Sequence, residues 1–142
     1  MATINAAGLT SRIPNAGAYG NMNTEVFSYK GALSIADILR FPVKMPPYCQ
    51  AVDGILSSDT ANSGATFKLG YAATDGDAAA SDDDAFVVAG TAIATATRVR
   101  FNAPIVPPLP IKEWYPILTL AGGAIGANTT LTLVLNYIYI GH

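Results

Sequence analysis

The sequence has little charge. Charged residues make up 13% of the 142 residues, whereas hydrophobic residues make up 51%, and the charged share is about half of what is usual for a globular domain. The formal net charge of −2 gives no basic footprint for nucleic acid. Two interpretations of the neutral surface remain open: either another molecule covers much of it, or Ala, Gly and Thr simply fill it.

Histidine and cysteine each occur once, and most catalytic and metal sites need more of them. Cys49 cannot form a disulfide within the chain, and the one histidine is His142. A GxSxG elbow, a phosphate-binding loop, paired histidine ligands and a CxxC motif are all absent. We therefore expect a protein that is not an enzyme and has no cofactor or metal. In this interpretation Cys49 is a small apolar residue of the core.

Long apolar runs are also missing. No stretch approaches the about 18 consecutive apolar residues of a membrane-spanning helix. Residues 1–23 lack the basic start and the apolar core of a secretory signal. We expect a protein without a membrane contact that is made in the cytoplasm and used without secretion.

What the sequence does have is strand alternation, and it is clearest over residues 113–140. Leu131, Leu133, Leu135, Tyr137 and Tyr139 share one face of the last run, since residues i and i+2 of a strand point the same way. The connector GGAIGAN before this run suits a hairpin loop. The pattern predicts a terminal hairpin whose second strand is central. Its opposite face is apolar only near the end, where an arm or a second copy is expected to cover it.

Shorter strand patterns cover much of the remaining chain, at residues 24–30, 50–57, 66–72 and 97–103. In the second of these, Val52 and Leu56 are expected on one face. Residues 33–41 fit either a short helix or an extended segment. Several short strands with turns between them and almost no helical periodicity predict an all-β fold. We expect a jelly-roll-like β-sandwich at residues 24–142, preceded by an extended N-terminal arm at residues 1–23.

An acidic segment at residues 74–84 is the one cluster that resembles a metal site. It holds Asp75, Asp77, Asp82, Asp83 and Asp84, and carboxylate oxygens are the ligands that Ca²⁺ requires. The glycine and the glutamate of an EF-hand are missing at their positions. The pattern favours a solvated loop over a Ca²⁺ site, and an acidic patch that docks onto a basic partner is a third interpretation.

Three segments are candidates for contact with a partner protein. The arm is rich in Ala, Gly and Asn, the segment PIVPPLP cannot lie inside a sheet, and the strand at residues 97–103 carries two arginines on one face, near which Lys68 would complete a basic strip. Plain solvation of those charges is the simpler alternative. The candidate contact residues are Arg12, Ile13, Pro14, Tyr19, Arg98, Arg100, Ile105, Val106, Pro107, Pro108 and Leu109.

The order of these features resembles a known family. FKLGY at residues 67–71 precedes the aspartates, and TRVRF (97–101), EWYPILTL (113–120) and the final GGAIGANTTLTLVLNYIY follow. This series resembles the small capsid cement, or decoration, proteins of tailed bacteriophages over roughly residues 65–140. Pro116 departs from the family, which usually keeps a strand residue there, and it leaves the start of that strand open.

The resemblance implies a jelly roll without catalytic residues, small symmetric oligomers (commonly dimers), and binding across the seams between major capsid subunits. The leading hypothesis is a virion structural protein on the outer surface of the phage head that cements neighbouring major capsid subunits. The alternative is a carbohydrate- or receptor-binding jelly roll of a phage tail or spike, which needs an aromatic platform or a Ca²⁺ site.

Overall fold

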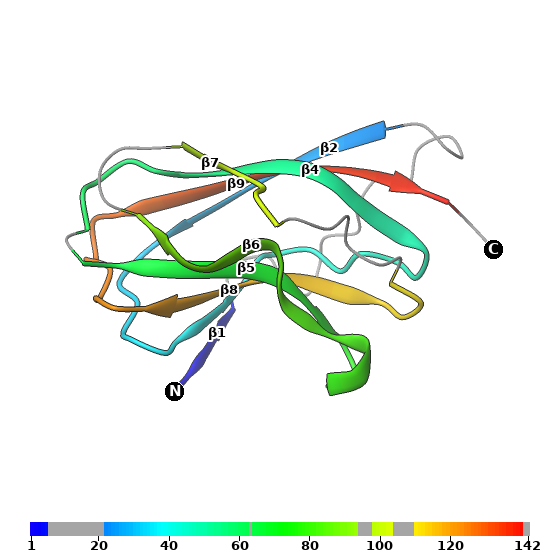
Figure 1. Ribbon diagram of the computed structural model, residues 1–142, viewed down its shortest axis with the longest axis horizontal. Coiled ribbons are helices and arrows are strands. Elements are labelled where there is room, and N and C mark those ends of the chain that lie inside the picture. Colours follow the sequence, from blue (N-terminus) through cyan, green and yellow to red (C-terminus); the bar gives the residue numbers. More distant parts are fainter. Residues whose placement is uncertain (6–21, 63, 94–97, 104–109, 141–142) are drawn as a thin grey trace.

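The computed structural model describes residues 1–5, 22–62, 64–93, 98–103 and 110–140. Two β-sheets pack face to face in this part of the chain (Figure 1). None of its helices is long and apolar enough to cross a membrane. The elements are β1 (Thr3–Asn5), β2 (Met22–Lys30), β3 (Ile38–Arg40), β4 (Cys49–Ser58), β5 (Thr66–Ala73), η1 (Ala78–Ala80), β6 (Asp82–Ala92), β7 (Arg98–Arg100), β8 (Trp114–Ala121) and β9 (Thr130–Tyr139).

The strand order identifies the architecture. One sheet has the order β1-β3-β8-β5-β6 and the other the order β2-β9-β4-β7. The chain passes back and forth between the two sheets, and β5 and β6 are consecutive strands that pair with each other. Two interleaved four-stranded sheets of this order make a jelly roll, a sandwich of two Greek keys. The predicted all-β sandwich is therefore confirmed, and β1 extends it by pairing in parallel with β3.

The core lies between the sheets and follows the alternation of the strands. In β9, Leu131, Leu133, Leu135 and Tyr137 are fully buried, and β9 lies between β2 and β4. The prediction of a central strand with a leucine and tyrosine face is thus confirmed. The inward residues of β5 that alternation predicted are buried as well, and large aromatic side chains fill the centre: Phe27, Phe41, Phe67, Phe86 and Trp114.

The predicted terminal hairpin is wrong, because β8 and β9 lie in different sheets. Both strands direct an apolar face toward the same core, and that pattern fits two facing sheets as well as one hairpin. The connection between them crosses the edge of the sandwich. Ile125 in this connection is buried, and it exchanges backbone hydrogen bonds with Leu33 at 2.9 and 3.0 Å. β8 begins at Trp114, so Pro116 lies inside the strand.

The expected sidedness of β4 is also wrong at one end. The pairing of β4 with β9 shifts between Ala51 and Asp53, so one extra residue enters the strand as a bulge. Val52 is therefore 41% exposed, whereas Leu56 is 2% exposed. A bulge reverses the alternation on one side of it, and simple counting placed both residues on one face.

The structure decides for the extended interpretation of residues 33–41 and changes the interpretation of two other segments. Residues 33–41 form no helix: Asp37 closes a turn by accepting the backbone N–H of Ser34 at 2.9 Å, and β3 follows. The acidic segment is not one loop, since η1 interrupts it and Asp82–Asp84 begin β6. At the N-terminus, Thr3–Asn5 of the expected arm belong to a sheet as β1, and residues 6–21 lie outside the described residues.

Candidate interaction surface

A row of apolar side chains crosses the outer face of the β2-β9-β4-β7 sheet. Val26 of β2 is in register with Val134 of β9, and Val134 is in register with Ile55 of β4. Their chain neighbours Phe27, Leu133 and Leu56 point into the core, so the row points away from it. Val26 is 51% exposed, and the other two residues are half-buried. The row is the apolar centre of this face.

Polar residues lie on both sides of the apolar row and bond to one another. On one side, Thr24 donates its hydroxyl hydrogen to the Asn136 side-chain oxygen at 2.7 Å. On the other side, the hydroxyls of Ser28 and Thr132 are 3.2 Å apart and share a hydrogen bond. Ser57 donates to the Thr132 carbonyl at 3.5 Å. Much of the hydrogen-bonding capacity of these rows is thus used within the face.

The predicted contact residues Arg98 and Arg100 lie at the margin of this face, on the short edge strand β7. The Arg100 guanidinium binds both carboxylate oxygens of Asp53, with Nη2 at 2.6 Å from Oδ2 and Nε at 3.2 Å from each oxygen. This charge-assisted hydrogen bond lowers the pKa of Asp53. Arg98 is exposed and in register with Ser57.

The expected basic strip with Lys68 does not form. Lys68 belongs to the other sheet and pairs with Asp83 at 2.6 Å. On the β2-β9-β4-β7 face, Lys30 at the end of β2 is a third exposed cation, besides Arg98 and Arg100. Neither Lys30 nor Arg98 makes an ion pair in the part of the chain that the structure describes.

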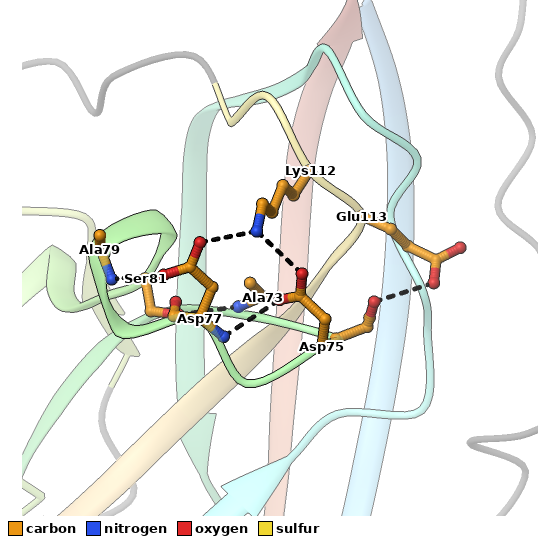
Figure 2. A network of polar contacts seen from close by, with 8 residues as sticks. Ala73, Asp75, Asp77, Ala79, Ser81, Lys112 and Glu113 are labelled. Carbon is orange, nitrogen blue, oxygen red and sulfur yellow. Dashed lines mark hydrogen bonds and ion pairs between the residues drawn. The ribbon is translucent and has the colours of Figure 1, made fainter.

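The acidic segment forms two separate groups. In the first, Lys112 lies between two carboxylates, with Nζ at 2.8 Å from Asp75 Oδ2 and 2.6 Å from Asp77 Oδ2 (Figure 2). Asp77 also caps η1 by accepting the Ala79 N–H at 2.9 Å. The hydrogen bonds from Lys112, followed by those from backbone amides, lower the pKa of both aspartates. The lysine therefore anchors this loop to the residues before β8.

Ser81 and Thr74 fasten the two ends of the same loop. Ser81 donates to the Asp77 carbonyl at 2.7 Å and accepts the Ala73 N–H at 2.9 Å. Thr74 donates to Glu113 Oε1 at 3.0 Å. Beside the loop is an open hollow of about 300 Å³, lined by Tyr71, Asp77, Ala79, Ala80, Pro110, Ile111 and Lys112.

The second acidic group is Asp82, Asp83 and Asp84 at the start of β6. Their carboxylates offer oxygens within 4.8 Å of one another, and burial, then the hydrogen bond with Asp84, raises the pKa of Asp82. Lys68 already neutralises part of this charge through Asp83. Carboxylates are suitable ligands for a cation, but no other feature of this group indicates a bound cation.

Trp114 and Tyr115 are adjacent aromatic residues at the start of β8, and they have different surroundings. Trp114 is fully buried, and its indole N–H donates to the Cys49 carbonyl at 3.0 Å. Tyr115, on the outer face of the β1-β3-β8-β5-β6 sheet, stacks under the guanidinium of Arg40 at 5.4 Å. No aromatic side chain among the described residues is fully exposed.

Cys49 is buried in the core, as predicted, and burial raises its pKa to about 12. The other candidate contact residues, Arg12, Ile13, Pro14, Tyr19 and residues 105–109, lie outside the described residues. Sequence reasoning missed Val26, Val134 and Ile55. The alternation of β2 and β9 contained a signal for the first two, whereas their alignment with Ile55 depends on the strand pairing.

No protein-family model and no curated protein sequence matches this chain. Among solved structures, the chain resembles a chain of the capsid of Ralstonia phage GP4, with a TM-score of 0.79, 19% identity and coverage of 99% of both chains. It also resembles a chain of the capsid asymmetric unit of cyanophage Pam1, with a TM-score of 0.60, 16% identity and coverage of 87% of this chain and 89% of that one. At these identities the likeness is one of fold. The chain therefore shares its jelly roll with components of two phage capsids.

Proposed function

We propose that this chain is a non-enzymatic structural protein of a phage virion, which binds the outside of the head and cements neighbouring major capsid subunits. The observation that carries the proposal is the likeness to the chain from the Ralstonia phage GP4 capsid, which extends over 99% of both chains. That chain matches this one over its whole length and is part of a capsid. The likeness therefore supports a capsid role best.

The physical basis of cementing is linkage. A protein that binds assembled subunits and not separated ones stabilises the assembled state by mass action. A compact sandwich with few charged residues and a sheet face that is apolar at its centre suits this role, because interface centres are depleted in charge. The chain has this composition, with 13% charged residues.

The proposed contacts with the major capsid protein include Arg98 and Arg100, together with the arm residues Arg12, Ile13, Pro14 and Tyr19 and residues 105–109. A homo-oligomer, with a dimer favoured, is part of the proposal. Deleting the whole arm would also remove β1, which pairs with β3. Substituting Ile13 or Tyr19 with Asp tests the arm while it keeps that strand.

Co-sedimentation tests the function. Heads assembled from the major capsid protein of the same phage, without this chain, are mixed with the purified protein and pelleted. We expect saturable binding to heads, no binding to free capsid subunits, and a higher melting temperature of the decorated heads. Heads that neither bind the protein nor gain stability would overturn the proposed function.

A further inference from the structure

The outer face of the β2-β9-β4-β7 sheet carries several exposed apolar side chains close to one another. Met22, Val26 and Val52 on this face are three of the large apolar residues that remain exposed. Three half-buried apolar residues adjoin them: Ile138 is in register with Met22, Val134 with Val26, and Ile55 with Val134. Contiguous exposed apolar patches on a globular domain mark sites of protein contact more often than chance. A partner that covers the apolar row at the centre of the face would therefore gain the most from burying apolar surface.

Covering this face has a low desolvation cost. The polar residues beside the row already bond to one another through Thr24 and Asn136, and through Ser28 and Thr132. Polar groups that keep their partners when water leaves do not incur the penalty of an unsatisfied buried group. The carboxylate of Asp53 is likewise held by Arg100. A partner thus meets few groups that would need new partners.

The charge of the face decides which partner fits. Within its four strands the outward-facing formal charges are those of Lys30, Arg98, Arg100 and Asp53, which sum to +2. Asp59, one residue past β4 and bonded to Thr130, lowers the sum to +1, whereas the whole chain has a net charge of −2. The two cations without an ion pair, Lys30 and Arg98, lie on the two outer strands of the sheet, three strand spacings or roughly 14 Å apart. Two copies of this face brought together would oppose positive charge with positive charge, which disfavours a symmetric dimer through it.

We infer that this face is the docking surface for the capsid, and that it fits a surface of the major capsid protein with an apolar centre and carboxylates on both sides. This inference rests on the proposed function and specifies its interface. The apolar row supplies buried area at the centre, and Lys30 and Arg98 supply ion pairs at the rim. Rim charges contribute mainly to association rate and orientation, so the binding should weaken as salt is raised.

Two variants and two matched controls test the surface in the co-sedimentation assay. Val26→Lys places a charge in the apolar row, and Ile35→Lys makes the same change at a position that is 57% exposed and lies in the turn before β3. Arg98→Glu reverses a rim charge, and Lys44→Glu reverses a charge away from the face, next to Glu113. Melting curves confirm that each variant is folded.

We expect Val26→Lys to weaken binding to heads about tenfold or more. Arg98→Glu should weaken it roughly tenfold at low salt and flatten its salt dependence. Both controls should bind within about twofold of the wild type, because they lie outside the contact.

The outcomes distinguish a wrong docking surface from a wrong proposed function. If the wild type binds heads and the two test variants bind equally well, the docking surface is wrong and the proposed function stands. If Arg98→Glu strengthens binding, the partner surface is basic and the inferred chemistry is wrong. If sedimentation velocity shows a dimer that Val26→Lys abolishes, the occupant is a second copy and the capsid contact is overturned. Wild-type protein that does not bind heads overturns both proposals.

Discussion

At the residue scale, Gly70 shows how closely β5 and β6 approach each other at the edge of the sandwich. The pairing of β5 with β6 is irregular on both sides of Leu69. A Cβ atom at Gly70 would lie 2.6 Å from the Asp83 carbonyl carbon and 2.8 Å from its Cα, and it would also clash with the Asp82 carbonyl oxygen. These are backbone atoms, which cannot rotate away as a side chain can. The irregular pairing at the acidic strand therefore depends on glycine.

We expect Gly70→Ala to destabilise the fold by about 1–3 kcal/mol, the usual cost of an overpacked site. Urea unfolding followed by circular dichroism measures this free energy. Gly126→Ala is the matched control, because a Cβ there meets nothing within 4 Å. Equal stability of the two variants would show that β6 shifts freely at this point.

The pair of carboxylates on Lys112 gives the acidic loop a pH dependence. Both Asp75 and Asp77 have pKa values below the ordinary 3.8 because Lys112 hydrogen-bonds to their ionised forms. A carboxyl group whose folded-state pKa is depressed stabilises the fold above its unfolded-state pKa, and the contribution is lost as the pH falls through the folded-state value. The ion pairs therefore act in full above about pH 4 and fade below it.

We expect Lys112→Met to lower the melting temperature at pH 7 by a few degrees at most, since exposed ion pairs contribute little. The difference from the wild type should shrink toward zero as the pH falls below 3.8 and through the lowered folded-state pKa values of Asp75 and Asp77. Lys30→Met, which removes a lysine without an ion pair in the described residues, should show no such trend. A pH-independent difference for Lys112→Met would mean that its alkyl chain, and not its charge, matters.

At the element scale, β9 joins the core and the proposed interface within one strand. Leu133 is fully buried in the core, whereas its neighbour Val134 lies in the outer apolar row. Leu133→Ala should cost about 2–5 kcal/mol in the free energy of unfolding, because it leaves a cavity. Val134→Ala should cost less than about 1 kcal/mol, as expected for a half-exposed strand position. Urea titration of both variants compares the two faces, and similar losses would contradict the assigned orientation of β9.

The same strand shows how far sequence reasoning reaches. Alternation correctly predicted which residues of β9 face the core, because that follows from a local period. It could not show that β8 lies in the other sheet, since two facing strands and two paired strands have the same apolar pattern. The bulge at Val52 was equally invisible, because an extra residue is defined only against the partner strand.

The candidate site was predictable only in part for the same reason. Arg98 and Arg100 could be found because two charges alternate within one short run. Val26, Ile55 and Val134 come from three separate strands, and only the register β2-β9-β4 makes them neighbours. A surface assembled from distant segments leaves no local pattern in the sequence.

At the scale of the whole molecule, one contact in the core joins the two sheets. Trp114 belongs to β8 in one sheet, and it donates to the carbonyl of Cys49 in β4 of the other sheet at 3.0 Å. Both side chains are fully buried. The chain crosses from one sheet to the other at almost every connection. Unfolding of one sheet should therefore disrupt the other sheet as well. We expect the sandwich to unfold as one cooperative unit.

The single thiol provides the measurement of that cooperativity. Burial raises the pKa of Cys49 to about 12, and the thiolate is the reactive form, so the folded protein should resist a thiol reagent at pH 8. Labelling should then require global opening, and the opening free energy from the labelling rate should equal the free energy of unfolding in urea. Fully unfolded protein in high urea, which should react at once, provides the reference rate. Fast labelling that is insensitive to urea would instead show that the edge around Cys49 opens locally, and the two sheets would then not form one cooperative unit.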